Sequence, residues 1–211
     1  MIKNRENGRS MIEMLGVLAV VGVLSVGGIS GYSKAMHKYK LNKTIEQVTN
    51  LSQNIRTFFA NQKGSGKYKV LSVSSNCFSG GILTSAGSPS CTGAQIVKKA
   101  RLIPDEMYGS GDSGLEHAFG GDLEIAEEGD GLRFRIVLSK IPPEACIELV
   151  TQNWEKVSAG IFMIRVLGIQ SDKFFCASGR EGCGSYFPIE IDQATNACNR
   201  QSGNMIQLFY E

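Results

Sequence analysis

The most restrictive feature of this chain is the run MIEMLGVLAVVGVLSVGGI at residues 11–29, in which every position except Glu13 is apolar or small. Its length is close to the ~20 residues that a helix needs to cross a hydrocarbon core of ~30 Å. A secretory signal peptide has a shorter apolar region, followed by a cleavage site of small residues. The segment SGYSKAMHKYK that follows this run contains no such site. The run therefore predicts a membrane-spanning helix with a carboxylate close to its start.

The helical pattern continues beyond the apolar run. Apolar side chains recur every three or four residues, with polar residues between them, which is the pattern of an amphipathic helix. The apolar stripe comprises Leu41, Ile45, Val48, Leu51, Ile55 and Phe58, and the polar face comprises Lys43, Gln47, Asn50 and Gln53. Because no proline precedes Pro89, we expect one helix from about Ser10 to Gln62, roughly 80 Å long at 1.5 Å per residue. The GSG at residues 64–66 would end it.

The charges are sorted along the chain although the net charge is only +2. Residues 1–101 hold 14 Lys/Arg and 3 Asp/Glu, whereas residues 102–211 hold 8 and 17. No cluster of aromatic and basic residues accompanies the positive charges, so nucleic-acid binding is not indicated. Residues 105–130 contain nine acidic residues and no Lys or Arg, but they lack the ligand spacing of an EF-hand. A solvated face, or an edge that contacts the basic helix of an adjacent subunit, is favoured over a calcium site.

All six cysteines follow the apolar run, and none belongs to a C-x-x-C pair. With only two histidines in the chain, a metal site is poorly supported. An even number of cysteines beyond a membrane segment favours disulfides in an oxidising compartment, although six cysteines allow 15 pairings. Cys77 and Cys91 bracket a loop rich in Ser and Gly, which a bridge would hold in shape. Cys183 is an available partner for Cys176, which we prefer to a catalytic pairing of Cys176 with His117, so no enzymatic activity is expected.

The residues after 63 predict a globular α+β head. Residues 94–103 and 142–154 have helical spacing, and Trp154 falls at the end of the second helix. DLEIAEEGDGLRFRIVLS alternates as a β-hairpin, with Leu123 and Ile125 on one arm and a turn at EEGDG. The inward residues of the other arm are Leu132, Phe134, Ile136 and Leu138. Further strands are expected at 161–169, 186–191 and 205–210. The predicted class is a long N-terminal helix, half membrane-spanning and half amphipathic, packed through the stripe ending at Phe58 and Phe59 on an antiparallel sheet.

The N-terminus resembles that of a type IV prepilin. The resemblance rests on a short charged leader ending in glycine, MIKNRENG, followed by an apolar run with glutamate at its fifth position. It implies cleavage by prepilin peptidase between Gly8 and Arg9, N-methylation of the new terminus at Arg9, and a role in subunit assembly for Glu13. In the filament, the Glu13 carboxylate would pair with the Arg9 amine of a neighbouring subunit. Arg9 departs from the family pattern, in which the mature chain usually begins with an aromatic or large apolar residue.

The head resembles that of type IVb pilins, although the short leader is more typical of type IVa. Three phrases carry this resemblance: KKARLIPDEMY, FGGDLEIAEEGDGLRFRIVLSKIPPEACIELV and NACNRQSGNMIQLFY. In that class a cysteine on the helix after the "IP" phrase pairs with one near the C-terminus. The resemblance therefore implies a disulfide between Cys146 and Cys198.

The resemblance implies four segments: a leader at 1–8, a membrane and filament-core helix at 9–31, its amphipathic continuation at 32–62, and the head at 63–211. It also implies a pilus subunit that polymerises with its own copies. The subunit would first lie in the bacterial inner membrane with its head in the periplasm, and then in the extracellular pilus. Its other partners would be prepilin peptidase and the pilus assembly machinery, with no cofactor. The alternatives are a minor pilin, a pseudopilin of a type II-like secretion system, or a membrane-tethered monomer that binds a ligand or mediates adhesion.

Overall fold

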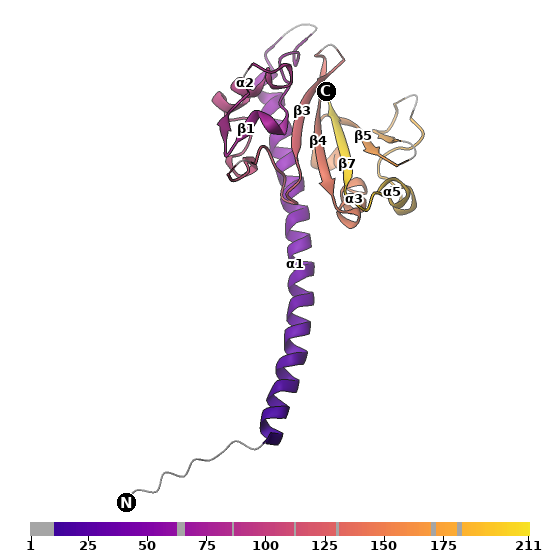
Figure 1. The fold of residues 1–211 in the computed structure, drawn as a ribbon. Helices are drawn as coiled ribbons and strands as arrows, with labels where there is room; N and C mark the ends of the chain where they lie inside the picture. Colours follow the sequence, from indigo (N-terminus) through magenta and orange to yellow (C-terminus); the bar gives the residue numbers. More distant parts are fainter. Residues whose placement is uncertain are drawn as a thin grey trace, which may run out of the picture. The chain divides into compact units, whose positions relative to one another are not determined.

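The computed structural model describes residues 11–62, 66–85, 87–111, 113–129, 131–169, 172–180 and 183–211. The chain divides into two compact units, and the division lies between Tyr39 and Lys40. The predicted long helix is present as α1 (Met11–Phe59), so this division falls within the helix (Figure 1). We use "head" for the unit from Lys40 to Glu211, which includes the C-terminal part of α1.

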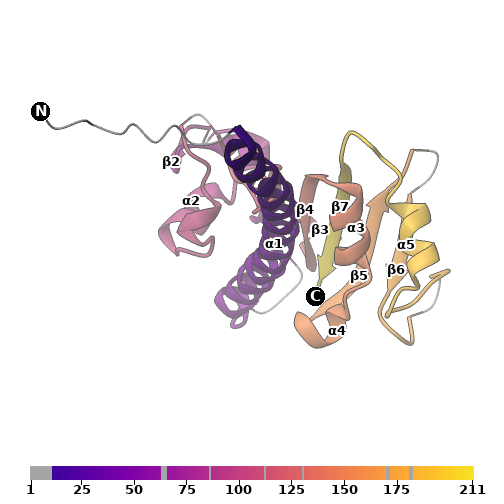
Figure 2. The same ribbon diagram turned by 90° about the horizontal axis from the view of Figure 1, so that it is seen from below.

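The head is built on a five-stranded antiparallel sheet with the strand order β3-β4-β7-β5-β6 (Figures 1 and 2). Its strands are β3 (Leu123–Glu128), β4 (Arg133–Ile141), β5 (Ile161–Leu167), β6 (Lys173–Cys176) and β7 (Asn204–Tyr210). β3 and β4 form the predicted hairpin, in which Leu123 lies opposite Leu138 and Ile125 lies opposite Ile136. Side chains at alternate positions face the core, as in a sheet with one covered face. The α+β class and the antiparallel sheet predicted from the sequence are confirmed.

Short helices and a small sheet complete the head. They are β1 (Phe78–Ser79) and β2 (Ile82–Leu83), which pair with each other, α2 (Ala94–Lys99), α3 (Pro143–Val150), α4 (Trp154–Val157) and α5 (Ile191–Ala197). α3 and α5 are in contact and lie side by side in the view from below (Figure 2). Pro143 occupies the first turn of α3, where a residue without an N–H loses no helical hydrogen bond.

The part of α1 in the head packs on the sheet through the predicted apolar stripe. Val48, Leu51 and Ile55 are completely buried and belong to one core with Ile136 of β4 and Leu208 of β7. Full burial of each such side chain contributes roughly 1.5–3 kcal/mol. The amphipathic half of α1 is therefore a structural element of the head.

The end of the stripe differs from the prediction by one residue. Phe58 is 46% exposed, whereas Phe59 is buried. Phe59 follows Ile55 by four residues, which keeps it on the core face, and its ring lies 5.4 Å from that of Tyr68. Tyr68 in turn contacts Phe134 of β4, with ring centroids 4.9 Å apart. The last turn of α1 is thereby joined to the sheet through aromatic contacts.

The helix predicted over residues 142–154 is shorter than expected. α3 ends at Val150, and Trp154 begins the separate helix α4. Trp154 is nevertheless buried, and its indole N–H donates to Leu149 O at 2.7 Å. Trp154 therefore lies in the core, as the helical spacing predicted, although α3 does not extend to it.

The strand predicted over residues 186–191 is also wrong. Tyr186 makes an isolated parallel bridge to Cys176, and α5 begins at Ile191. A proline within the segment has no N–H to donate to a sheet ladder. The sequence pattern did not reveal β6 or α5. Leu132, placed on the inward side of the hairpin, instead precedes β4 and is 55% exposed.

Candidate functional site

The first candidate site is the apolar part of α1. Every side chain from residue 11 to residue 35 is exposed in the isolated chain, and α1 is long and apolar enough to cross a membrane. Two hydroxyl groups within this part are satisfied by the helix itself. Ser25 Oγ donates to Val21 O at 2.7 Å and Ser33 Oγ donates to Ile29 O at 3.0 Å. A polar group in hydrocarbon requires such internal satisfaction, and an exposed apolar surface of this extent marks an interaction site.

Glu13 introduces the one carboxylate of this apolar part. It lies in the first turn of α1, where the partial positive charge of the helix terminus favours an anion. Glu13 shares a helix face with Gly16, Val17 and Val20, which follow it at spacings of three, four and seven residues. The carboxylate therefore borders an apolar strip. Gly8 and Arg9, the predicted cleavage and methylation residues, lie outside the described residues.

The six cysteines form three disulfides, Cys77–Cys91, Cys146–Cys198 and Cys176–Cys183. The first closes the loop rich in Ser and Gly, the second joins α3 to the end of α5, and the third closes a short loop after β6. In the second disulfide the Cα atoms are 5.7 Å apart, within the usual range for a disulfide. Because Cys176 is bonded to Cys183, its thiol is not available as the nucleophile considered from the sequence.

The acidic loop, residues 105–122 with residue 112 outside the described part, is attached to α1 at two points. Lys43 Nζ lies 2.6 Å from the Glu106 carboxylate, a hydrogen bond that raises the pKa of Lys43 above its ordinary value. The Ala118 N–H donates to Gln47 Oε1 at 3.0 Å. Gln47, predicted to lie on the polar face of the helix, is only 3% exposed. That prediction was wrong because the loop covers this part of α1.

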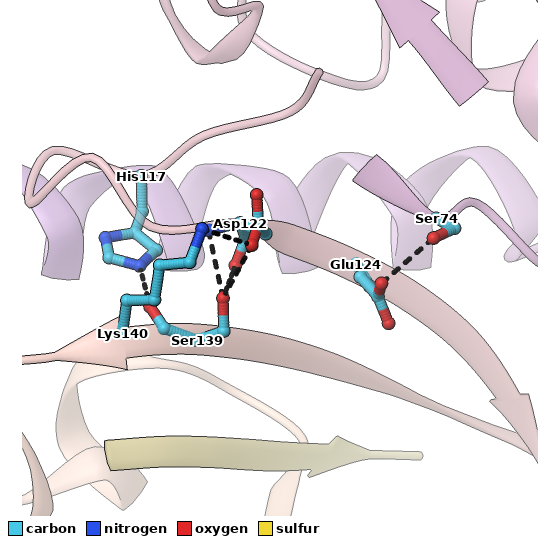
Figure 3. Close-up of polar contacts among 6 residues, drawn as sticks. All are labelled: Ser74, His117, Asp122, Glu124, Ser139 and Lys140. Atoms are coloured by element: carbon cyan, nitrogen blue, oxygen red, sulfur yellow. Dashed lines mark hydrogen bonds and ion pairs between the residues drawn. The ribbon is translucent and has the colours of Figure 1, made fainter. Parts of the chain in front are cut away.

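The acidic loop is also attached to β4, through a polar cluster around Asp122 (Figure 3). The Asp122 carboxylate accepts from Lys140 Nζ at 3.0 Å and from Ser139 Oγ at 3.3 Å. His117 Nε2 lies 2.8 Å from Ser139 O. The figure also shows Glu124 of β3, which accepts from Ser74 Oγ at 2.9 Å. Several of the acids that the sequence groups together therefore bind cations and hydroxyls of the same head, and none of the described residues gathers into a group of three or more potential metal ligands.

From the sequence, His117 was considered as a metal ligand and as a catalytic base, and its structural position was missed. It is 3% exposed and its ring is hydrogen-bonded at both nitrogens, since Nδ1 accepts from the Phe119 N–H at 3.3 Å. The neighbouring Gly120-Gly121 pair was the available signal, because a glycine often marks a close approach. A Cβ on Gly121 would lie 2.6 Å from His117 Nε2, and closer still to Ser139 O.

Gly121→Ala is therefore expected to destabilise the head by roughly 1–3 kcal/mol, the usual cost of overpacking a filled site. Gly184→Ala is the matched control, because a Cβ there meets nothing within 4 Å. The measurement is urea unfolding of the full chain in detergent micelles, followed by the fluorescence of the single tryptophan, Trp154. Equal midpoints for the two variants would contradict the close packing of Gly121 against His117.

No family model matches the chain. The chain is 22% identical over 211 residues to the major structural subunit of the bundle-forming pilus of Escherichia coli O127:H6 (strain E2348/69 / EPEC), covering 99% of this chain and 96% of the relative. It is 21% identical, with the same coverage, to the protein of the same description from Escherichia coli O111:H-. Among solved structures, the type IVb pilin of Salmonella typhi matches with a TM-score of 0.46 and 16% identity, covering 81% of this chain and 99% of that chain.

The similarity to the two pilus subunits extends over almost the whole chain, and the residues that it covers include both the apolar helix and the head. The chain, with its long N-terminal helix and antiparallel α+β head, is thus similar to a pilus subunit over almost its whole length. Both of these relatives are major structural subunits of a bundle-forming pilus.

Proposed function

We propose that the chain is the structural subunit of a type IV pilus and polymerises through the apolar part of α1. The observation that carries this proposal is the exposure of every side chain from residue 11 to residue 35 in an isolated chain. Such a surface requires an apolar environment. The inner membrane supplies it before assembly, and the helices of neighbouring subunits supply it in the fibre. The head would lie in the periplasm and then on the outside of the pilus, and disulfides suit both compartments.

The proposal assigns a role to Glu13 and to the residues before it. Prepilin peptidase would cut between Gly8 and Arg9 and expose an amine, which is then methylated. The Glu13 carboxylate of one subunit would pair with the Arg9 amine of the next. Because an unpaired charge in an apolar core is strongly unfavourable, this pair would fix the axial register of the subunits.

Mass spectrometry of sheared filaments tests the proposal directly. We expect a chain that begins at Arg9 and carries one additional methyl group. In a host without prepilin peptidase, we expect the full chain beginning at Met1 and no filaments. A chain that begins at Met1 in the normal host would contradict the proposed processing. An unchanged mass in both hosts would favour a membrane-tethered monomer.

Electron microscopy with an antibody against the head separates the remaining alternatives. A major subunit is expected to be labelled along the whole filament. Labelling at rare points or at the tip alone would favour a minor pilin, and the absence of extracellular labelling would favour a pseudopilin.

A further inference from the structure

We propose that His117 is an acid-sensitive latch that holds residues 113–122 against α1 and β4 at neutral pH and releases them when its imidazole is protonated. The inference concerns the head alone and goes beyond the polymerisation of α1. It depends on three observations: the hydrogen bonds of the ring, the charges that face it, and the contacts that its segment makes with two other elements.

The hydrogen bonds of His117 select one neutral form of the ring. The Phe119 N–H points to Nδ1 at 3.3 Å, so Nδ1 must be the acceptor. The hydrogen then lies on Nε2, which donates to Ser139 O at 2.8 Å. Protonation places a second hydrogen on Nδ1, directly opposite the Phe119 N–H. The imidazolium therefore loses one hydrogen bond and gains a repulsive contact between two donors.

The surroundings of the ring do not compensate fully for a positive charge. Burial lowers the pKa of His117 below its ordinary value of 6.5, against the opposing effects of the hydrogen bond to Ser139 and of the carboxylates of Asp122 and Glu116. Lys140 of β4 adds to the lowering, and the Asp122 carboxylate is already paired with it. On α1, the charged group one turn before Gln47 is Lys43, whose ammonium is paired with Glu106 and Glu46.

The segment around His117 joins α1 to the sheet. The next residue, Ala118, donates its N–H to Gln47 of α1, and the His117 ring bonds to β4. Gly121 approaches the ring without room for even one methyl group, so the ring cannot turn toward Gly121 within the closed structure. We expect the unfavourable contact to be relieved by movement of the segment as a whole, which would expose the buried side chain of Leu115.

The direction of the pH dependence follows from linkage. The pKa of His117 in the closed head lies below 6.5, so the open state binds more protons in mildly acidic solution. The stabilisation is fully present above the ordinary pKa and is lost as the pH falls through the lowered one. In the window between the two values, the equilibrium constant for local opening is expected to rise about tenfold per pH unit.

The test uses the full chain in detergent micelles with ¹³C-labelled histidine, because the chain has only two histidines and so gives two ring signals. We expect the His117 signal to titrate below pH 6.5. Over the same window we expect the amides of residues 115–122 within this segment to lose protection from hydrogen exchange, after correction for the intrinsic rate. His117→Gln keeps an N–H that can donate to Ser139 O but cannot be protonated, so its segment should stay protected to lower pH.

His37→Gln is the matched control, because it removes the other histidine and should leave the protection profile unchanged. The proposal would be overturned if His117 titrated while the amides of the segment stayed protected. It would also be overturned if His117→Gln and the unmodified chain lost protection at the same pH, because protonation of the carboxylates would then cause the release. If His117→Gln does not fold, the unmodified chain still tests the proposal. The titration curve of the His117 ring and the loss of amide protection must then fall in the same pH range.

Discussion

Glu13→Ala is expected to insert into the membrane normally and to form almost no filaments. Insertion should be unaffected or improved, because a carboxylate within a membrane helix costs up to about 2.5–3.5 kcal/mol. Assembly should fail because the variant leaves the proposed partner, the Arg9 amine of the next subunit, unpaired in an apolar core. Removal of one member of a buried pair costs about 3–5 kcal/mol. Each subunit contact would thus weaken by about two to four orders of magnitude.

Two measurements distinguish the steps. Carbonate extraction of membranes reports insertion, and electron microscopy with quantification of sheared material reports filaments. Glu46→Ala is the matched control, because it removes a carboxylate from the same helix that pairs with Lys43 of its own chain. Normal filaments from Glu13→Ala would mean that the carboxylate merely lies at the membrane interface and does not set the register.

Removal of the Cys146–Cys198 disulfide is expected to destabilise the head more than removal of the Cys176–Cys183 disulfide. The two residues are separated by 52 positions, and in the chain-entropy description a loop of this size contributes about 4 kcal/mol by restricting the unfolded state. The double variant Cys146→Ala/Cys198→Ala should therefore lower the free energy of unfolding by about that amount. Such a loss is a large part of the stability of a typical domain, about 5–15 kcal/mol.

The control is the double variant Cys176→Ala/Cys183→Ala, whose cysteines are separated by 7 positions. The same description gives about 2 kcal/mol for this shorter loop. Urea unfolding of the full chain in micelles, followed by the fluorescence of Trp154, measures both losses under identical conditions. Equal losses for the two pairs would show that loop length does not determine what these bridges contribute.

The sequence predicted α1 well because its signals are local. An uninterrupted apolar run and a stripe with helical spacing specify a helix without reference to the rest of the chain. The β3–β4 hairpin was predicted for the same reason, since alternation and a glycine-containing turn lie within one short segment. Phe58 shows the limit of this reasoning, because helical spacing permits a step of either three or four residues. Phe59 is buried in place of Phe58 because it contacts Tyr68, whose position the helical pattern does not reveal.

The errors concern residues whose environment is set by distant parts of the chain. Gln47 has the composition of a solvent face but is covered by a loop that lies about 70 positions later. The predicted strand at residues 186–191 has suitable side chains, yet β6 pairs with β5, and α5 packs beside α3. The role of His117 depends on Ser139 O, a backbone atom that no side-chain pattern reveals.

The candidate site residues also differ in whether local sequence or distant parts of the chain determine them. Glu13 could be selected from the sequence because a carboxylate in an apolar run is conspicuous in any fold. The choice among the 15 possible cysteine pairings could not be made from composition, because it depends on which loops the sheet brings together. A resemblance to a known family supplied the pairing of Cys146 with Cys198, and the structure contains that bridge.

The strand order of the head has a consequence for its biosynthesis. β7 is the last strand in the sequence but the middle strand of the sheet, between β4 and β5. Until residues 204–210 have been made, the β3–β4 hairpin and the β5–β6 pair have no common neighbour, and an incomplete sheet leaves unpaired edges. Residue 198, the later partner of the longest disulfide loop, is also made at this stage. The apolar part of α1 is therefore complete long before the head can close.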